Sequence, residues 1–493
     1  MLQARTHEEY NHLEMSKAFV SSSLLLPVLH AASVAFSRIY ARKSEAGLLS
    51  DRQRYVYGNV EDGLREGVSS ARNQDSVYAI YRAFALGCLR KASCEEAAIL
   101  GLMAYECAMS FKGKSTLTER DWGEGFVKSY EVAKSLYKGP VLFEEGSVLK
   151  RAYAEGVSTL DDLIAVLSHP YSPSHDGEIF YDFLKAQAIG FASPLPLGEE
   201  SPFDSLSPTR LEKEGYSLSF FLQCLNAKNK PFDYEDFSSF LNAHAKEVSI
   251  KQEGSQVFVD CLTMDPAPIL DKSQEYGEFV NLKLRNRYIE ELDAKPRLYK
   301  APHPSIKGRA VMVSSPSMKC TSLFLDLGAE TVMDKTGIEE MRIEHLLEAF
   351  RSSSCPNILF LPTSSTEALL GKIASRLISS KNVIVLNSSS LQEAYFALSD
   401  AMFEDEGIDA LLESLGRGID SIAPYEAKKG HLLETLQAIP NIEEAEICFI
   451  MSGEGNEEEL EAVQAALEDI NPYLEIGSLD IGSNETYLIG VSR

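Results

Sequence analysis

From about residue 305 to the end of the chain, short apolar runs alternate with segments of helical apolar spacing. The runs are rich in valine, isoleucine and leucine, which is typical of strands buried on both faces. Strands that alternate with helices predict a parallel sheet covered on both sides. We therefore predict an α/β domain with a parallel sheet over residues 305–493. The predicted strands are 310–313, 358–361, 383–386, 447–450 and 487–491, and the predicted helices are 343–350, 365–378, 391–402 and 457–470.

Two proline-rich links divide the rest of the chain. The first holds Pro194, Pro196, Pro202 and Pro208, and the second holds Pro296, Pro302 and Pro304. Prolines at this spacing are incompatible with a helix interior and indicate domain boundaries. Residues 1–195 show helical spacing and no strand pattern, which predicts an all-α domain. Within it, residues 19–36 are expected to form a pair of core helices rather than a signal peptide or a membrane span.

Residues 209–295 differ in character from both neighbours. The run 255–262 has the β-branched and aromatic composition of a strand, and 266–276 has the spacing of a helix that ends near Gly277. This combination predicts a small α+β middle domain.

Several helices are expected to begin at a serine or threonine that lies three residues before an acidic side chain. In a capping box, the hydroxyl accepts from the backbone N–H three residues on, and the acidic side chain returns to the N–H of the cap. The predicted pairs are Ser93 with Glu96, Thr159 with Asp162, Ser364 with Glu367, and Ser390 with Glu393.

Composition excludes several function classes. The formal net charge is -26, and a surface this acidic repels nucleic acid and anionic lipid, so we expect neither a nucleic-acid partner nor stable membrane insertion. The eight cysteines contain no Cys-x-x-Cys pair and are typical of free thiols in a reducing compartment, which predicts a cytoplasmic protein. None of the nine histidines has metal-ligand spacing to a cysteine, so no metal site is predicted.

The loop after the first predicted strand of the α/β domain is the main ligand candidate. Ser314, Ser315 and Ser317 would offer hydroxyl and N–H groups to an anion at the carboxyl edge of the sheet. The alternative is that these serines only cap a helix and form a turn, since the loop has no glycine. The segment 452–456 has the same two interpretations. The sequence has no G-x-x-x-x-G-K-[ST], G-x-G-x-x-G, H-E-x-x-H or G-x-S-x-G motif.

The order of the three domains, together with several segments, resembles the A subunit of bacterial fatty acid kinase. Residues 215–220 stand where that family has Tyr-Cys-Thr-Glu-Phe, residues 257–266 where it has Val-His-Val-His-Thr-x-x-Pro, and 269–277 continue the match. Residues 70–73 with 77–85, and 104–117, are similar to segments of its N-terminal domain. The resemblance implies a dihydroxyacetone-kinase L-type (DhaL) domain, a middle domain and a DegV-like C-terminal domain.

This sequence differs from the family at the positions where the family has its metal-binding and nucleotide-binding residues. Residues 24–27 replace the aspartate-rich Mg²⁺ loop, and 72–76 replace the glycine-rich nucleotide turn. Ser217 replaces a zinc-type cysteine, Asp260 and Leu262 replace two histidines, and 335–341 replace a Gly-Gly-Gln-Thr-Met-Asn-Pro stretch. The residues left as candidates for a vestigial nucleotide site are Ser70, Arg72, Asn73, Ser115 and Thr116.

These departures predict a fold kept for binding, with no catalytic residues, no metal and no cofactor. The expected role is a non-catalytic regulator of a DegV-type fatty-acid-binding partner, in a homodimeric chain. One alternative is an active kinase that uses ATP and Mg²⁺ to phosphorylate a protein-bound fatty acid or a dihydroxyacetone-like substrate, with Glu61, Asp62 and Asp75 as metal carboxylates. A second alternative is an α/β protein that binds a small molecule.

Overall fold

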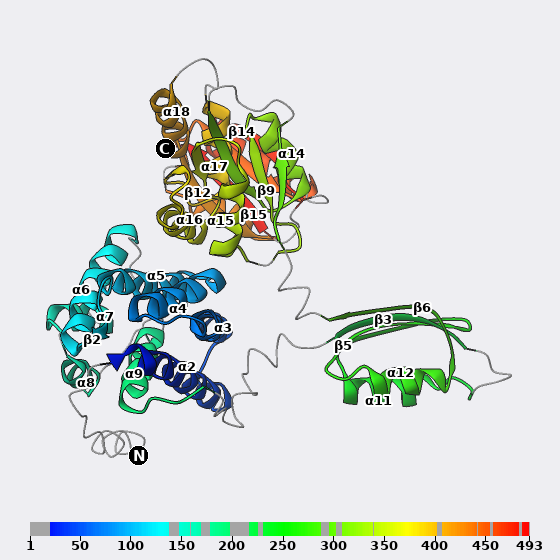
Figure 1. Ribbon diagram of the computed structural model, residues 1–493. Helices are drawn as coiled ribbons and strands as arrows, with labels where there is room; N and C mark the ends of the chain where they lie inside the picture. Colours follow the sequence, from blue (N-terminus) through cyan, green and yellow to red (C-terminus); the bar gives the residue numbers. More distant parts are fainter. Residues whose placement is uncertain are drawn as a thin grey trace. The chain divides into compact units, whose positions relative to one another are not determined.

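A computed structural model describes residues 20–137, 147–157, 159–168, 178–197, 216–224, 230–286, 295–301, 308–338, 340–401, 407–440, 442–453, 457–482 and 486–492 (Figure 1). The chain forms two compact units. The first comprises Met1–Phe36, Asn59–Glu199 and Lys295–Arg493, and the second comprises Ser37–Gly58 and Glu200–Ala294.

The N-terminal region is helical, as predicted. Val20–Ser21 (β1) and Thr116–Leu117 (β2) add a short antiparallel pair that the sequence does not reveal. The expected pair of helices at 19–36 is wrong, because Pro27 lies inside one continuous helix, α2. The helices are α2 (Ser22–Glu45), α3 (Asp51–Ala71), α4 (Val77–Lys91), α5 (Glu95–Ser110), α6 (Glu119–Leu136), α7 (Val148–Ala154), α8 (Leu160–Ser168) and α9 (Glu178–Ala192).

Helix α2 is the one described helix whose length and composition would allow it to cross a membrane. Of its most apolar window, 61% is buried inside the protein. A buried core helix passes the same test of length and composition.

The second unit contains a four-stranded antiparallel sheet in the order β4-β5-β3-β6, with both helices on one face (Figure 1). Alternate residues of β3, such as Leu218, Phe220 and Leu222, are buried against Phe237 and Leu241 of α11. This arrangement agrees with the predicted small α+β region. Its elements are β3 (Tyr216–Cys224), α11 (Tyr234–His244), β4 (Lys246–Glu253), β5 (Gln256–Thr263), α12 (Ala267–Gln274) and β6 (Gly277–Asn286).

The C-terminal region has two sheets rather than the single parallel sheet that we predicted. The first has the order β11-β10-β8-β9-β7, in which β7 alone is antiparallel to its neighbour. Strand β7 lies beside the second proline link, where no strand is predicted. The elements are β7 (Arg297–Lys300), β8 (Arg309–Ser315), α14 (Met318–Asp326), β9 (Thr331–Asp334), α15 (Ile343–Ser352), β10 (Asn357–Leu361), α16 (Ser365–Leu377) and β11 (Asn382–Val385).

The second sheet has the order β12-β15-β13-β14 and mixes parallel and antiparallel pairs. The predicted runs 447–450 and 487–491 are indeed strands, but they pair with each other and not with β10. The sequence does not reveal strands β12 and β14, because both are partly polar and resemble loops. The elements are α17 (Leu391–Asp400), α18 (Ile408–Asp420), β12 (Ile422–Lys428), α19 (Leu432–Gln437), β13 (Ile447–Ser452), α20 (Glu457–Ile470), β14 (Glu475–Asp480) and β15 (Thr486–Ser492).

One apolar core joins the two sheets. Val311 and Leu359 of the first sheet share a buried cluster with Leu415 of α18 and Met451 of β13. Burial of such side chains supplies most of the stability of this region. The core also fixes the strand ends from which the polar loops described below emerge.

Candidate functional site

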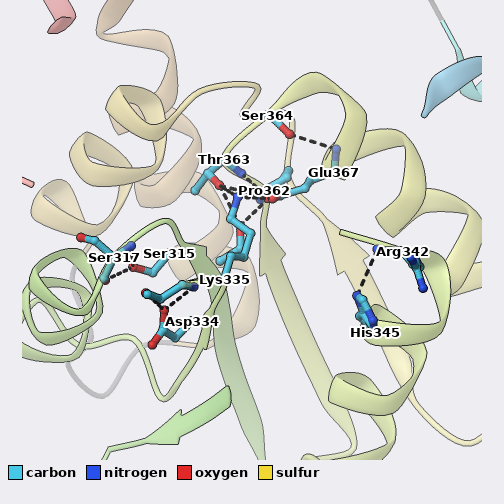
Figure 2. Close-up of polar contacts among 12 residues, drawn as sticks. Ser315, Ser317, Asp334, Lys335, Arg342, His345, Pro362, Thr363, Ser364 and Glu367 are labelled. Carbon is cyan, nitrogen blue, oxygen red and sulfur yellow. Dashed lines mark hydrogen bonds and ion pairs between the residues drawn. The ribbon is translucent and has the colours of Figure 1, made fainter. Parts of the chain in front are cut away.

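A buried polar cluster lies where three parallel strands end. Strands β8, β9 and β10 run parallel, so their carboxyl ends meet at one edge of the first sheet. In open α/β sheets this edge is where ligands usually bind. Ser314 comes from the end of β8. Lys335 follows β9, and Thr363 follows β10 (Figure 2). Glu367, in the first turn of α16, is the acceptor that joins them.

The Glu367 carboxylate accepts hydrogen bonds on both oxygens. Its Oε2 accepts from the hydroxyl of Ser314, from the Thr363 hydroxyl at 3.0 Å and from the Thr363 backbone N–H at 3.1 Å. Its Oε1 accepts from Lys335 Nζ at 2.5 Å. The Ser314 and Thr363 hydroxyl oxygens are also 2.7 Å apart. The described hydrogen bonds to this carboxylate therefore all come from within the cluster.

Glu367 and Lys335 form a largely buried ion pair within the cluster. The side chain of Glu367 is 4% exposed and that of Lys335 is 20% exposed. Burial raises the pKa of the Glu367 carboxyl, but Lys335, Ser314 and the Thr363 N–H more than offset this and hold the pKa below its ordinary value. Glu367 is consequently ionised at neutral pH, with Lys335 as its counter-ion.

The loop that carries Lys335 is fixed by its own backbone. The Lys335 N–H donates to the Ser315 carbonyl at 2.8 Å, and the N–H of Thr336 donates to the buried Asp334 carboxylate at 2.8 Å. Gly337 has a φ of 80°, a left-handed conformation that favours glycine. On the neighbouring loop, the buried Ser388 hydroxyl donates to the Pro362 carbonyl at 2.5 Å. Both loops thus present Lys335 and Thr363 in defined positions.

Of the three serines singled out in the sequence, Ser314 alone contacts Glu367 in the described contacts. The Ser315 hydroxyl donates to the Ser317 carbonyl at 2.7 Å, which closes a turn. The Ser317 hydroxyl accepts from the N–H of Cys320 at 3.2 Å as the N-cap of α14, and donates to the Ile481 carbonyl at 2.5 Å. Ser315 and Ser317 therefore have the capping and turn roles that were the alternative for this loop.

The residues of the predicted vestigial nucleotide site lie in or directly beside two turns of the helical region. Ser70 is in the last turn of α3 and donates to Glu66 at 3.2 Å, and Arg72 and Asn73 are exposed in the turn that follows. Ser115 is exposed, and Thr116, also exposed, pairs with Ser21 in the short β1–β2 ladder.

These two turns are at the same end of the α4–α5 pair. Tyr78, in the first turn of α4, donates to Met109 Sδ, near the end of α5, at 3.6 Å. The rings of Tyr81 and Phe111 also meet, with centroids 5.1 Å apart. The structure thus brings the two turns to one end of the helix pair, and no contact between the five candidate side chains is described.

The middle-region positions that stand for the family's metal ligands share one sheet face. Ser217 of β3 lies directly opposite Leu262 of β5, and Asp260 lies two residues from Leu262 on the same strand. Across the described residues, no three His, Cys, Asp or Glu side chains come together in a way that would hold a metal ion. The other loop singled out in the sequence begins at Ser452, at the end of β13, but residues 454–456 lie outside the described residues.

The predicted capping pairs differ in outcome. Ser364 and Ser390 cap α16 and α17, and Thr159 and Asp162 form the predicted reciprocal box. The carboxylates of Glu367 and Glu393, however, accept from the residue before the cap and not from the cap itself.

The predicted cap at Ser93 is wrong. The N-cap of α5 is Cys94, because Ser93 instead exchanges hydrogen bonds with Asn59, at 2.6 Å and 3.0 Å. A partner distant in sequence therefore competes with the local cap.

Comparisons with known proteins give one family match in the C-terminal region and relatives of low identity over larger parts of the chain. Residues 310–423 match the FakA-like C-terminal family, which is named for the A subunit of fatty acid kinase. An uncharacterized protein of Staphylococcus epidermidis is 19% identical over 420 residues, which is 76% of this chain and 72% of that protein. One of Staphylococcus saprophyticus is 20% identical over 258 residues, or 49% of this chain and 45% of that protein. The crystal structure of a DegV family protein from Corynebacterium glutamicum aligns with a TM-score of 0.28 and 15% identity, over 37% of this chain and 96% of that one.

Proposed function

We propose that the chain, whose residues 310–423 match the FakA-like C-terminal family, is a divergent, non-catalytic relative of the fatty acid kinase A subunit that acts by binding. Its partner would be an acyl-carrying protein of the DegV type, whose activity or availability it regulates. The dimeric state and cytoplasmic location expected from the sequence remain predictions.

The observation that carries this proposal is the closed turn between α3 and α4. A nucleotide-binding turn presents free backbone N–H groups to phosphate. Here the N–H of Arg72 donates to the Ser69 carbonyl at 3.3 Å, and that of Gln74 donates to the Ala71 carbonyl at 3.2 Å. Ser76 accepts from the N–H of Ala79 at 3.2 Å and so caps α4. Internal partners therefore use N–H groups that a phosphate would need.

Charge in the same turn also supports a role without nucleotide. Asp75 is exposed just before the start of α4, where a nucleotide phosphate would lie, and like charges repel. No glycine with positive φ lies in the described turn at 72–76 that would let a phosphate approach the backbone closely.

The alternative of a diverged active kinase requires Glu61, Asp62 and Asp75 to share one Mg²⁺. Glu61 is buried and forms an ion pair with Arg65 at 3.1 Å. The ten residues from Glu61 to Ala71 at the end of α3 span about 15 Å along the helix axis. Carboxylates that share one Mg²⁺ lie about 2.1 Å from it. The separation of Glu61 from the turn therefore argues against this assignment.

Two assays test the proposal together. The full chain, incubated with Mg·ATP and a DegV-type protein loaded with fatty acid, should transfer no phosphate to the acyl group. In an interferometry assay, the same chain should bind the acyl-loaded protein more tightly than the acyl-free form. Phosphoryl transfer that Asp62→Ala and Asp75→Ala abolish would instead support the kinase, and absence of any complex would contradict the binding role.

A further inference from the structure

The Glu367 carboxylate is surrounded by groups from separate parts of the first sheet. The Ser314 hydroxyl comes from the end of β8. The Lys335 ammonium comes from the loop after β9, and the Thr363 hydroxyl and N–H come from the loop after β10 (Figure 2). An ammonium, two hydroxyls and a backbone N–H are the donors with which proteins bind a carboxylate. The first turn of α16 adds the positive end of a helix dipole.

Capping alone does not explain this set of donors. Glu393 occupies the same position in α17, and it accepts from the Ser389 N–H at 2.6 Å and from the Ser389 hydroxyl at 3.0 Å. Glu367 makes the equivalent two bonds to Thr363, and it also accepts from Ser314 at the end of β8 and from Lys335 in the loop after β9. The additional donors converge at the sheet edge where external ligands bind in open α/β folds.

Stability is also a weak reason for this arrangement. A buried ion pair is often no more stabilising than apolar residues of similar volume, because both charges lose their hydration. A cluster of donors is more readily explained if it is built to bind a carboxylate.

We propose that Ser314, Thr363 and Lys335 form a carboxylate-binding site whose occupant is the chain's own Glu367 side chain. Tethering gives this internal carboxylate a high effective concentration, so an external carboxylate does not displace it. Once the Glu367 side chain is removed, the ligand that fits the emptied site is a small monocarboxylate. The proposal goes beyond the role proposed above and does not rest on it, because it concerns the C-terminal sheet and not the helical region.

Glu367→Ala opens the site to an external ligand. This substitution removes a methylene carbon and the carboxylate, which have the same heavy atoms as acetate. Acetate should therefore bind the variant saturably in calorimetry and raise the temperature of its unfolding. Sodium chloride at the same ionic strength should not. The native chain and Glu367→Gln, whose amide still fills the site, should show no acetate binding.

Two further measurements locate the ligand. In the double variant Glu367→Ala/Lys335→Met, acetate affinity should fall at least tenfold, because the ammonium is gone. In Glu393→Ala, the equivalent position of α17, acetate should bind no better than in the native chain. If Glu367→Ala does not fold in chloride, refolding in acetate should restore the folded yield.

The proposal is overturned if acetate and chloride act alike on Glu367→Ala, or if the native chain binds acetate as tightly as the variant. It is equally overturned if the variant fails to fold in both salts. None of these results bears on whether the helical region binds ATP, so a failure here is distinguishable from a failure of the proposed function.

Discussion

Replacing Lys335 with methionine removes the counter-ion of Glu367 and leaves most of the volume of the side chain. Breaking a buried pair in this way costs about 3–5 kcal/mol, because the remaining charge stays buried and unpaired. Lys335 is one-fifth exposed, so water reaches part of the pair, and we expect the lower end of that range, about 3 kcal/mol.

The loss should depend on pH in a defined direction. In the native chain the pKa of folded Glu367 is below its ordinary value, so the pair stabilises the fold above about pH 4.5 and loses this effect as the pH falls. In Lys335→Met, burial acts without the ammonium, and the pKa of Glu367 should lie above its unfolded value. The variant is then most stable with Glu367 protonated and loses stability as the pH rises. The deficit relative to the native chain should be larger at pH 8 than at pH 5.

Hydrogen exchange measured by mass spectrometry suits this test, since a chain with several regions does not unfold in one transition. Peptides from β8, β10 and α16 should lose protection, and peptides from β3 and β5 of the second unit serve as the internal control. A deficit below about 1 kcal/mol, the usual value of an exposed pair, would refute the reasoning. A deficit that does not change with pH would refute it as well.

Three other substitutions test the packing and electrostatics of the first unit. Gly87→Ala places a methyl group 2.6 Å from the Cα of Gly67 and should lower the free energy of unfolding by about 1–3 kcal/mol. Trp122 fluorescence should then change at a lower denaturant concentration. Gly416→Ala, which has open space around it, should cause no such loss of stability. Ser364→Ala removes the N-cap of α16 and should lower stability by about 1 kcal/mol in hydrogen exchange of that helix. Burial and Arg342 lower the pKa of His345 from 6.5 to about 4 (Figure 2). The free energy of unfolding of the native chain should therefore fall by up to about 1.4 kcal/mol per pH unit as the pH drops below 6.5. His345→Asn should lack this pH dependence. Equal pH profiles for the two proteins would contradict the assignment.

The sequence predicts the regular elements of this protein well where a local pattern determines them. Helix starts at Ser364 and Ser390 are correct because the cap hydroxyl and the N–H group that donates to it lie within one turn. The buried runs at 310–313 and 358–361 are correct because β8 and β10 are apolar on both faces.

Prediction from the sequence fails where the local structure is determined by a residue that is distant in the sequence or by pairing within a sheet. Ser93 is not a cap, because Asn59 takes its hydrogen bonds. The second sheet is missed because β12 and β14 carry polar side chains on their exposed faces.

The central role of Glu367 is the main feature of the site that sequence reasoning misses. Its spacing from Ser364 identifies it as a capping residue, and that spacing accounts fully for a glutamate at this position. Its partner Lys335 follows β9, a four-residue strand that was not predicted. A lysine directly after a buried strand, at the edge where parallel strands end, is the signal that would have pointed to the pair.

Calorimetric titration of Mg·ATP into the full chain tests most directly the central proposal, that this chain is a non-catalytic relative of the fatty acid kinase A subunit and binds no nucleotide at the turn between α3 and α4. With the N–H groups of Arg72 and Gln74 engaged by α3, the titration should give no saturable heat beyond that of Mg²⁺ alone. Saturable binding with micromolar affinity, weakened by Arg72→Ala or Ser70→Ala, would contradict the claim.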